Sequence, residues 1–240
     1  MTTYGDVHRR FLQSFVYHPV NTEAEALEAY RLTCEEQGQE MGSLNQLVDT
    51  INATIRKYTT LEIKTIFCEL TGQKYYIATN TADLKWTKNT SRYSKNEQLI
   101  FRKVLDDIVR SETGNISSIT CLNVYSNVNM SKSEMSATIA KFVRDGWFAE
   151  KKGRLYMGVR AAAELEPFIT QVYQDMTSSC PLCKKLIFWG HRCGSCPEVS
   201  HLHCLRKFFA STSGDAACPA CRARWHNWDE DYLSDMEESS

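Results

Sequence analysis

Eight residues near the end of the chain have the types and the spacing of ligands for two metal ions. They form four pairs, each with two residues between its members: Cys180 and Cys183, Cys193 and Cys196, His201 and Cys204, and Cys218 and Cys221. Two intervening residues let both side chains reach one tetrahedral ion. Seven of the ten cysteines lie in this stretch, so the sequence predicts two closed zinc sites.

The order of the ligands indicates how the pairs combine. Four cysteines are followed by one histidine and three cysteines, which fits a cross-braced module in which alternate pairs share an ion. The first zinc ion would use Cys180, Cys183, His201 and Cys204, and the second would use Cys193, Cys196, Cys218 and Cys221. Each ion would join segments distant in sequence, so zinc would supply folding free energy that a core of ~45 residues lacks.

Disulfide bonds are the alternative explanation for paired cysteines. Disulfides are typical of secreted chains, but the early apolar run from Phe11 to Tyr17 is short and is interrupted by Gln13 and Ser14, unlike a signal peptide. The remaining cysteines are isolated in sequence: Cys34, Cys68 and Cys121. This usage fits a reducing compartment, the cytosol or nucleus, and therefore favours zinc.

A second histidine competes for the place of the fifth ligand. His203 adjoins Cys204 and could hardly share its ion, whereas His201 is separated from Cys204 by the two residues that chelation requires. We therefore assign His201 as the ligand and expect His203 and His191 at the surface or beside the ligands.

Two classes of zinc module share this ligand order, RING-variant ubiquitin ligases and PHD fingers that bind histone tails. PHD fingers typically carry an aromatic residue two positions before the seventh ligand, where this chain has Ala216. The segment resembles a RING instead at residues that would contact a conjugating enzyme or ubiquitin: Leu182, Phe208 or Phe209, Pro219 and Arg222. Each apolar residue alone could simply fill a small core, but the four matches together favour a RING.

The residues before the zinc segment predict three short helices and a hairpin. Asp6 can cap a first helix, which His18-Pro19 then ends. Capping boxes start the second helix at Thr22 and the third at Ser43. Alternating side chains from 61 to 67, a break at 71–74 and the run 75–77 then predict a β-hairpin. The apolar faces of the first and third helices are Val7, Phe11 and Phe15, and Leu47, Ile51 and Ile55.

The same order of elements recurs after a polar stretch from Thr79 to Tyr93. Capping boxes at Ser94 and Ser131 start two helices, and the run Ile116 to Val128 predicts another between them. Asp145-Gly146 ends the third helix, and a hairpin follows from Trp147 to Met157, turning at 151–153. A last helix, Ala161 to Met176, leads to the zinc segment. The buried residues expected in the three helices with clear faces are Leu99, Phe101, Leu105 and Ile108; Met135, Ile139, Phe142 and Val143; and Leu165, Phe168, Ile169, Val172 and Tyr173.

Three helices followed by a hairpin, twice over, describe tandem winged-helix domains. We therefore predict an α+β chain with a first winged-helix domain at 1–80, a linker at 81–93, a second winged-helix domain with a connecting helix at 94–177, a RING-variant zinc module at 178–226 and an acidic tail at 227–240. The last twelve residues contain six acidic and no basic side chains, so we expect a disordered tail. No tract approaches the ~18 apolar residues that a membrane helix needs.

The charges of the predicted third helix bear on DNA binding, because winged-helix domains often insert that helix into the major groove. In the second domain this helix carries three basic residues, Lys132, Lys141 and Arg144, whose charge is largely offset by Glu134 and Asp145. The hairpin tip at 151–154 is basic. Without a basic face, attraction to phosphates is weak. We therefore predict that these domains dock proteins rather than bind DNA by themselves.

Taken over nearly its full length, the chain resembles the non-SMC element one family, the RING subunits of the five/six structural-maintenance-of-chromosomes (SMC) complex. The likeness lies in the ligand spacing and in five further places: the opening Asp-Val-His-Arg-Arg-Phe-Leu at 6–12, the stretch from Leu99 to Ser-Glu-Thr-Gly at 111–114, Lys-Phe-Val at 141–143, Trp147, and Trp225 just beyond the last cysteine. The resemblance implies a MAGE-domain partner gripping the winged helices, a kleisin partner and, through them, the SMC pair in recombinational DNA repair. DNA contact would be mainly indirect.

The resemblance also implies a nuclear, chromatin-associated ubiquitin ligase whose activity rises with the MAGE partner. A RING holds no covalent ubiquitin; it orders a ubiquitin-charged conjugating enzyme so that a substrate lysine can attack, a gain that comes from orientation. We therefore assign no catalytic nucleophile. The competing hypothesis is a scaffold whose zinc module only docks proteins.

Overall fold

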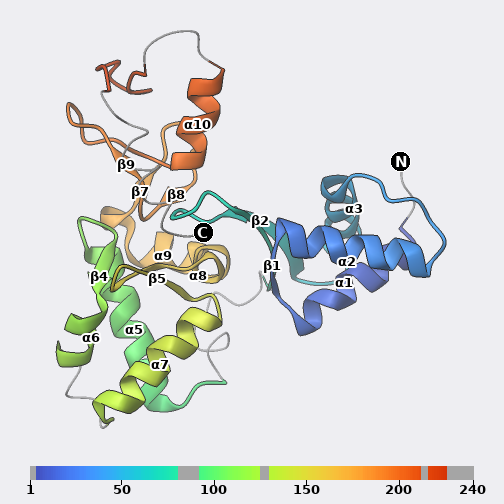
Figure 1. The fold of residues 1–240 in the computed structure, drawn as a ribbon, viewed down its shortest axis with the longest axis horizontal. Helices are drawn as coiled ribbons and strands as arrows, with labels where there is room; N and C mark the ends of the chain where they lie inside the picture. The colour runs from blue at the N-terminus through green and yellow to red at the C-terminus, as the bar shows by residue number, and fades with distance from the viewer. Residues whose placement is uncertain (1–3, 81–91, 125–129, 212–215, 226–240) are drawn as a thin grey trace.

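The computed structural model describes residues 4–80, 92–124, 130–211 and 216–225 of the 240-residue chain. Figure 1 shows an N-terminal region (4–80), a central region (92–176) and a C-terminal module (178–225). The predicted acidic tail, residues 81–91 of the predicted linker and residues 125–128 of a predicted helix lie outside the described ranges. Within those ranges, no helix combines the length and the apolar content needed to cross a membrane.

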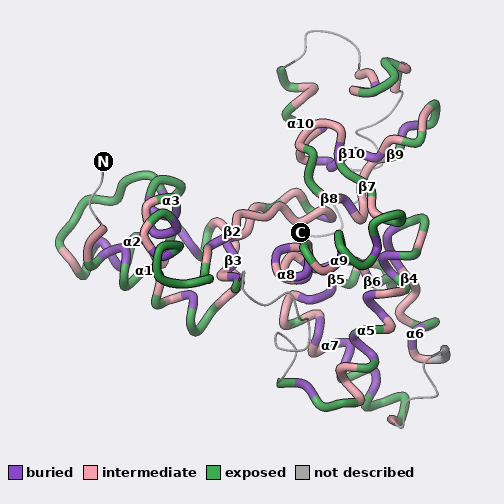
Figure 2. The backbone as a smooth tube through the Cα atoms, turned by 180° about the vertical axis from the view of Figure 1, so that it is seen from behind, coloured by how far each residue is buried: buried purple, intermediate pink, exposed green. Residues whose placement is uncertain are grey.

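The N-terminal region packs three helices against one face of a small antiparallel sheet. The helices are α1 (Asp6–Tyr17), α2 (Glu23–Glu36) and α3 (Leu44–Ile55), and the strands are β1 (Val20–Thr22), β2 (Leu61–Phe67) and β3 (Lys74–Asn80). The sheet order is β1-β3-β2. Phe11, Ile51 and Tyr76 are fully buried in its core, and the buried stretches follow the inner faces of these elements in Figure 2. The expected helices and hairpin are confirmed.

The helix starts follow the capping pattern with two exceptions. At Thr22 the side chain accepts a hydrogen bond from Glu25 N–H, and Glu25 accepts one in return; Ser94 and Ser131 start their helices in the same way. Ser43 is also an N-cap, but its side chain makes no capping bond. Gly5 precedes α1 and Asp6 is the first helical residue, so the predicted cap at Asp6 was wrong by one position. Its carboxylate there still complements the positive end of the helix dipole.

The central region repeats the order of the N-terminal one. It contains α5 (Lys95–Arg110), β4 (Asn115–Ser117), α6 (Ser118–Val124), α7 (Lys132–Arg144), β5 (Phe148–Lys151) and β6 (Arg154–Met157), with sheet order β4-β6-β5. Phe101, Phe142 and Trp147 are fully buried in its core. The hairpin turns at Lys152 and Gly153, both with positive φ, as a two-residue turn between twisted strands requires.

Four details of this region differ from expectation. Ile116 belongs to strand β4 rather than to a helix, because a three-residue strand is too short to leave a periodic signal. Leu99 is 41% exposed, since the buried face of α5 runs through Ile100 and Phe101. Val143 is half-buried beside the core. Tyr93, expected at the end of a linker, is buried and accepts a 3.0 Å hydrogen bond from Trp147 Nε1.

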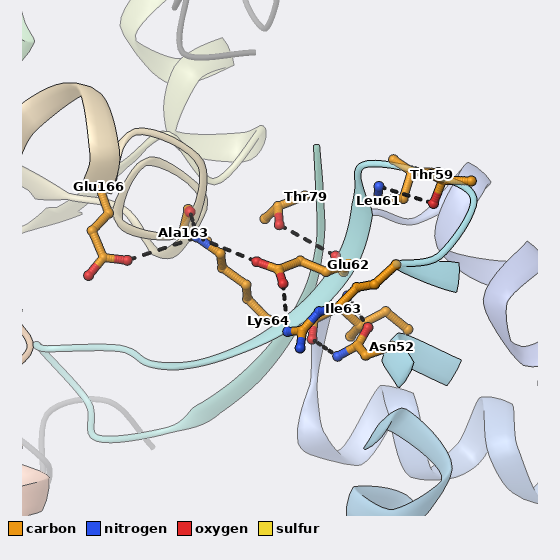
Figure 3. A network of polar contacts seen from close by, with 10 residues as sticks. Asn52, Thr59, Leu61, Glu62, Ile63, Lys64, Thr79, Ala163 and Glu166 are labelled. Atoms are coloured by element: carbon orange, nitrogen blue, oxygen red, sulfur yellow. Dashed lines mark hydrogen bonds and ion pairs between the residues drawn. The ribbon is translucent and has the colours of Figure 1, made fainter. Parts of the chain in front are cut away.

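The predicted helix from Ala161 to Met176 is broken into α8 (Val159–Glu164), α9 (Glu166–Val172) and a 3₁₀ turn, η1 (Gln174–Met176). The cause is Pro167, which has no N–H to donate to Ala163 four residues earlier. Lys64 Nζ takes the vacant place and donates to the Ala163 carbonyl at 3.0 Å, as Figure 3 shows. Val172, which was expected to be buried, is 56% exposed.

Strand β2 is one of the elements that connect the parts of the chain. On its inner side, buried Asn52 of α3 exchanges two hydrogen bonds with the backbone of Ile63, which fixes β2 on its own region. Toward the central region, Lys64 reaches Ala163 and lies 3.9 Å from the Glu166 carboxylate. At its far end, Phe67 stacks on His203 of the C-terminal module. One strand therefore contacts both other parts of the molecule.

The C-terminal module contains little regular structure. Two-residue strands β7 (Ser178–Ser179) and β8 (Leu186–Ile187) form one ribbon, and β9 (His191–Arg192) and β10 (Val199–Ser200) form another. The helix α10 (Leu202–Ala210) follows and buries Leu202 and Leu205. Such a small apolar core cannot stabilise a module of 48 residues by itself. The module therefore needs further cross-links, and its cysteines are the residues that could supply them.

Candidate metal centres

Two clusters of sulfur and nitrogen atoms occupy the C-terminal module. Cluster one is made of Cys180, Cys183, His201 and Cys204, and cluster two of Cys193, Cys196, Cys218 and Cys221. In each cluster the four ligand atoms lie within 4.8 Å of one another. The two groups interleave along the chain, so the structure brings together the same sets that alternate pairing predicts.

The distances within the clusters fit tetrahedral zinc. In cluster two, Cys193 and Cys221 have their sulfurs 3.7 Å apart, as do Cys196 and Cys218. A tetrahedron with Zn–S bonds of ~2.3 Å has edges of roughly 3.8 Å. In cluster one, His201 Nδ1 lies 3.3 Å from Cys183 Sγ and 3.9 Å from Cys204 Sγ. These sulfur–sulfur distances are far longer than the ~2.05 Å of a disulfide bond, and each cluster could hold one zinc ion.

The first and fourth pairs share one backbone turn. In Cys180-Pro-Leu-Cys183, Lys184 N–H donates to the Cys180 carbonyl at 2.8 Å; in Cys218-Pro-Ala-Cys221, Arg222 N–H donates to the Cys218 carbonyl at 3.0 Å. Lys184 and Arg222 have φ of 62° and 63°, a conformation uncommon outside glycine. The turn therefore fixes where each cationic side chain leaves the backbone.

The second pair is built differently. Pro197 follows Cys196, and its nitrogen has no hydrogen to close the same turn. Instead, Cys193 Sγ accepts hydrogen bonds from Ser195 N–H and from the indole N–H of Trp225, both at 3.4 Å. Trp225, noted in the sequence for its place beyond the last cysteine, is therefore a direct partner of cluster two.

Each cluster contains one cysteine whose pKa is lowered, which favours the thiolate that binds zinc. In the same clusters, the Glu198 N–H bond to Cys196 is outweighed by burial and neighbouring sulfurs, which raise the pKa of Cys196 to about 12, and burial and Cys180 raise the pKa of Cys204. Burial opposes ionisation of Cys180, but hydrogen bonds from His201 and from nearby backbone N–H groups prevail and lower its pKa to about 6. The Trp225 and Ser195 donors lower the pKa of Cys193 to about 6. Each cluster thus contains at least one thiol prepared to bind a cation.

His203 and His191, the histidines expected at the surface or beside the ligands, lie beside the clusters. His203 is stacked between His201 and Phe67, with ring centroids 4.9 Å and 4.4 Å away. Burial, followed by nearby His201, Lys207 and Lys185, lowers the pKa of His203 to about 4, so its ring is neutral at neutral pH. His191 packs against Trp225 at 4.6 Å.

A cavity of about 770 Å³ lies between β2, the start of α9 and the C-terminal module; we call it the inter-region cavity. Among the residues predicted to contact a conjugating enzyme, Leu182 and Phe208 line it together. Pro219 and Arg222 instead belong to the turn at the fourth pair, where Pro219 is half-buried and Arg222 is exposed. The cavity is also lined by Phe67 and Glu69 of the N-terminal region.

Glu69 is the functional candidate that sequence reasoning missed. Its carboxylate accepts hydrogen bonds from Phe188 N–H at 3.0 Å and Trp189 N–H at 2.9 Å, and Oε1 lies 3.3 Å from His201 Nε2. In the sequence it is an acidic residue next to a turn, which is ordinarily solvated. Because its partners are more than 100 positions away, no local pattern could have identified it.

Comparison with known proteins agrees with this geometry. Residues 180–221 match the family model for a RING-like domain, so the interleaved clusters belong to a RING-like zinc-binding module. Residues 8–128 match the model for the Nse1 non-SMC component of the SMC5-6 complex.

The relatives extend the likeness to the whole chain. Non-structural maintenance of chromosomes element 1 homologs from Rattus norvegicus and Homo sapiens are 34% and 32% identical, covering 92% and 94% of this chain and 84% and 86% of their own lengths. A chain of the solved Nse1-Nse3-Nse4 complex superposes with a TM-score of 0.78 at 28% identity, covering 94% of this chain and 98% of that one. The chain belongs to the Nse1 family, which confirms the resemblance found in the sequence.

Proposed function

We propose that this chain is a RING-type ubiquitin ligase subunit of an SMC five/six complex. The observation that carries the proposal is the joint exposure of Leu182 and Phe208 to the inter-region cavity. Leu182 lies within the turn at the first ligand pair and Phe208 on α10, the two positions where RINGs present apolar contacts to a conjugating enzyme.

In this proposal the eight residues of clusters one and two are the zinc ligands. Zinc, when bound, supplies the cross-links that hold the turns and α10 in place. The chain itself contributes positioning: Leu182 and Phe208 bind the conjugating enzyme, Pro219 stiffens the fourth pair, and Arg222 bridges the enzyme and its ubiquitin. The substrate lysine then attacks the thioester carbonyl, an isopeptide bond forms, and the cysteine of the conjugating enzyme leaves.

The rigid backbone at Arg222 supports its role as the bridging residue. Its left-handed conformation is closed by a hydrogen bond to Cys218, a ligand of cluster two. The guanidinium is a planar fork of donors that can bind carbonyls on two proteins at once. A positioned donor of this kind loses little entropy when the complex forms.

We further assign the N-terminal and central regions as tandem winged-helix domains that bind other subunits. In support, both have the order helix, strand, helix, helix, strand, strand, with the first strand paired to the last. The similar chain from the Nse1-Nse3-Nse4 complex suggests that the partners are Nse3-like and Nse4-like, the MAGE-domain and kleisin subunits implied by the sequence resemblance. The chain would then act in the nucleus, on chromatin, in recombinational DNA repair.

Direct DNA binding is a lesser part of this proposal because two of the basic residues on the third helix and the hairpin are paired with other side chains. Lys141 on α7 donates to Glu97 at 2.8 Å, and Arg154 on β6 hydrogen-bonds Asn115. Contact with DNA would therefore pass mainly through the other subunits.

The test is ubiquitin discharge from a charged conjugating enzyme to free lysine, with the MAGE-domain partner present. Leu182→Ala should abolish discharge, and Arg222→Ala should lower it roughly tenfold, the ~1.4 kcal/mol of one charge-assisted hydrogen bond. Lys184→Ala is the control for Arg222→Ala, because it places alanine at the equivalent left-handed position of the turn at the first ligand pair. It should keep both the zinc content and most of the discharge rate. Unchanged rates in both Leu182→Ala and Arg222→Ala would favour the scaffold hypothesis.

A further inference from the structure

The orientation of His201 leaves one ring nitrogen for a partner outside the cluster. Nδ1 points at the sulfurs of cluster one, 3.3 Å from Cys183. Nε2 points away from the sulfurs and lies 3.1 Å from the Leu186 carbonyl and 3.3 Å from Glu69 Oε1. When Nδ1 binds a metal, the remaining ring proton is on Nε2, and this proton lies between the Leu186 carbonyl and the Glu69 carboxylate.

Glu69 comes to this position from the hairpin loop after β2, in a different region of the chain. Besides His201, its carboxylate accepts the backbone N–H groups of Phe188 and Trp189. The side chains of Glu69 and His201 are only 12% and 6% exposed. A buried carboxylate is stable only with such partners, and here two backbone N–H groups and the nearby His201 ring nitrogen supply them.

The segment that Glu69 holds is also held from the opposite side. A Cβ on Gly114 of the central region would lie 1.8 Å from the Phe188 carbonyl oxygen, so the two backbones are in direct contact. Trp189 meets Tyr156 of β6 edge to face at 5.9 Å. Residues 188–189 therefore lie between the N-terminal and central regions, and Glu69 makes the hydrogen bonds on the N-terminal side.

A stack of three aromatic rings connects the N-terminal region to His201 beside the Glu69 contact. Phe67, two residues before Glu69, stacks on His203 at an interplanar angle of 15°, and His203 stacks on His201 at 25°. Lys207 Nζ lies 4.9 Å from the centroid of the Phe67 ring, so a cation covers the ring that stacks on His203. The His201 ring is therefore in contact with Glu69 at its Nε2 edge and with His203 on its face.

We infer that Glu69 is a positioning residue for His201, so that the N-terminal region supplies the outer carboxylate of the first zinc site. The inference rests on the proposed role of His201 as a ligand. A carboxylate that accepts the proton of a ligating histidine fixes its tautomer and ring orientation, and its loss typically costs roughly 10–100-fold in metal affinity. The zinc affinity of cluster one is thereby coupled to the docking of the first region.

The first measurement is zinc release from the full chain to a colorimetric chelator. Cys193→Ser, which removes a cluster two ligand, identifies the phase that belongs to cluster one. In Glu69→Gln and Glu69→Ala that phase should accelerate by roughly 10–100-fold, while the cluster two phase stays unchanged. Glu62→Gln is the matched control, because Glu62 lies on β2 and lines the same cavity but pairs with Arg56 and Lys64. It should release zinc as the wild type does.

A second measurement separates positioning from general loosening. In the ¹¹³Cd-substituted chain, Glu69→Gln should move the resonance of the three-cysteine, one-histidine site and leave the four-cysteine resonance in place. If Glu69→Gln released zinc at the wild-type rate and left both resonances in place, the inference would be overturned. The zinc assignment would still hold in that case, provided that native mass spectra showed two ions in the wild type and one in His201→Ala. If His201→Ala instead kept both ions, the ligand assignment and the inference would fall together.

Discussion

Clusters one and two use related ligand turns but have different surroundings. Cluster one is buried under the N-terminal region, with His201 5% exposed and in contact with Glu69. Cluster two is supported within its own module by Trp225 and Ser195, and its Cys221 is exposed. The same Cys-Pro-x-Cys turn therefore serves in one place as a junction between regions and in the other as a local cross-link.

The largest expected effect is that of removing zinc from both clusters. Chelation should unfold residues 178–225, because binding to structural sites contributes on the order of 10 kcal/mol of folding free energy and the module has little apolar core. The N-terminal and central regions should stay folded, since each has its own core. Hydrogen exchange by mass spectrometry would resolve the three parts, and a protected module after complete chelation would contradict this prediction.

Removing one cluster at a time should reveal the difference between them. Cys183→Ser should raise amide exchange at Phe188 and Trp189 by roughly 10-fold or more, which means that the free energy of local opening falls by about 1.4 kcal/mol. The reason is that the loosened His201 no longer lies beside Glu69. Cys196→Ser is the control in cluster two and should leave these amides protected. If both variants exposed 188–189 equally, the two clusters would form one cooperative unit.

A smaller effect is expected from Trp225→Phe, which keeps an aromatic ring and removes the indole N–H. Cys193 Sγ would lose one donor, so its pKa should rise from about 6 toward the usual value. Zinc release from cluster two should accelerate several-fold, about 1 kcal/mol for one hydrogen bond, with cluster one unaffected. Release from both clusters at wild-type rates would show that the indole N–H has no such role.

The smallest effect concerns the other contact made by β2. Lys64→Met keeps the length of the side chain but cannot donate to Ala163, so stability should fall by about 1 kcal/mol. Pro167→Ala supplies an N–H to the same carbonyl and should rescue most of that loss in the double variant. Thermal unfolding of the three variants tests this, and a Pro167→Ala change that failed to rescue Lys64→Met would contradict the explanation of the helix break.

Local signals in the sequence were sufficient for much of this fold. The capping boxes at Thr22, Ser94 and Ser131 placed three helices because the cap and its partner are three residues apart. The ligand pairs were identifiable for the same reason. Pro167 was also visible and should have divided the predicted helix at 161–176.

What the sequence could not indicate are contacts between regions. Strands β1 and β4 are stable only through their pairing with β3 and β6, and Glu69 acquires its role only when β2 reaches the C-terminal module. Both depend on tertiary contacts between distant residues, which neither residue spacing nor local propensity encodes.

The most direct test of the two-cluster arrangement is zinc counting by native mass spectrometry on paired substitutions. Wild-type chain should carry two ions. Cys183→Ser with Cys204→Ser damages cluster one twice and should leave one ion, whereas Cys183→Ser with Cys196→Ser damages both clusters and should leave none. If neighbouring pairs along the chain shared an ion, the two double variants would exchange their results, and that outcome would contradict the interleaved clusters on which this account depends.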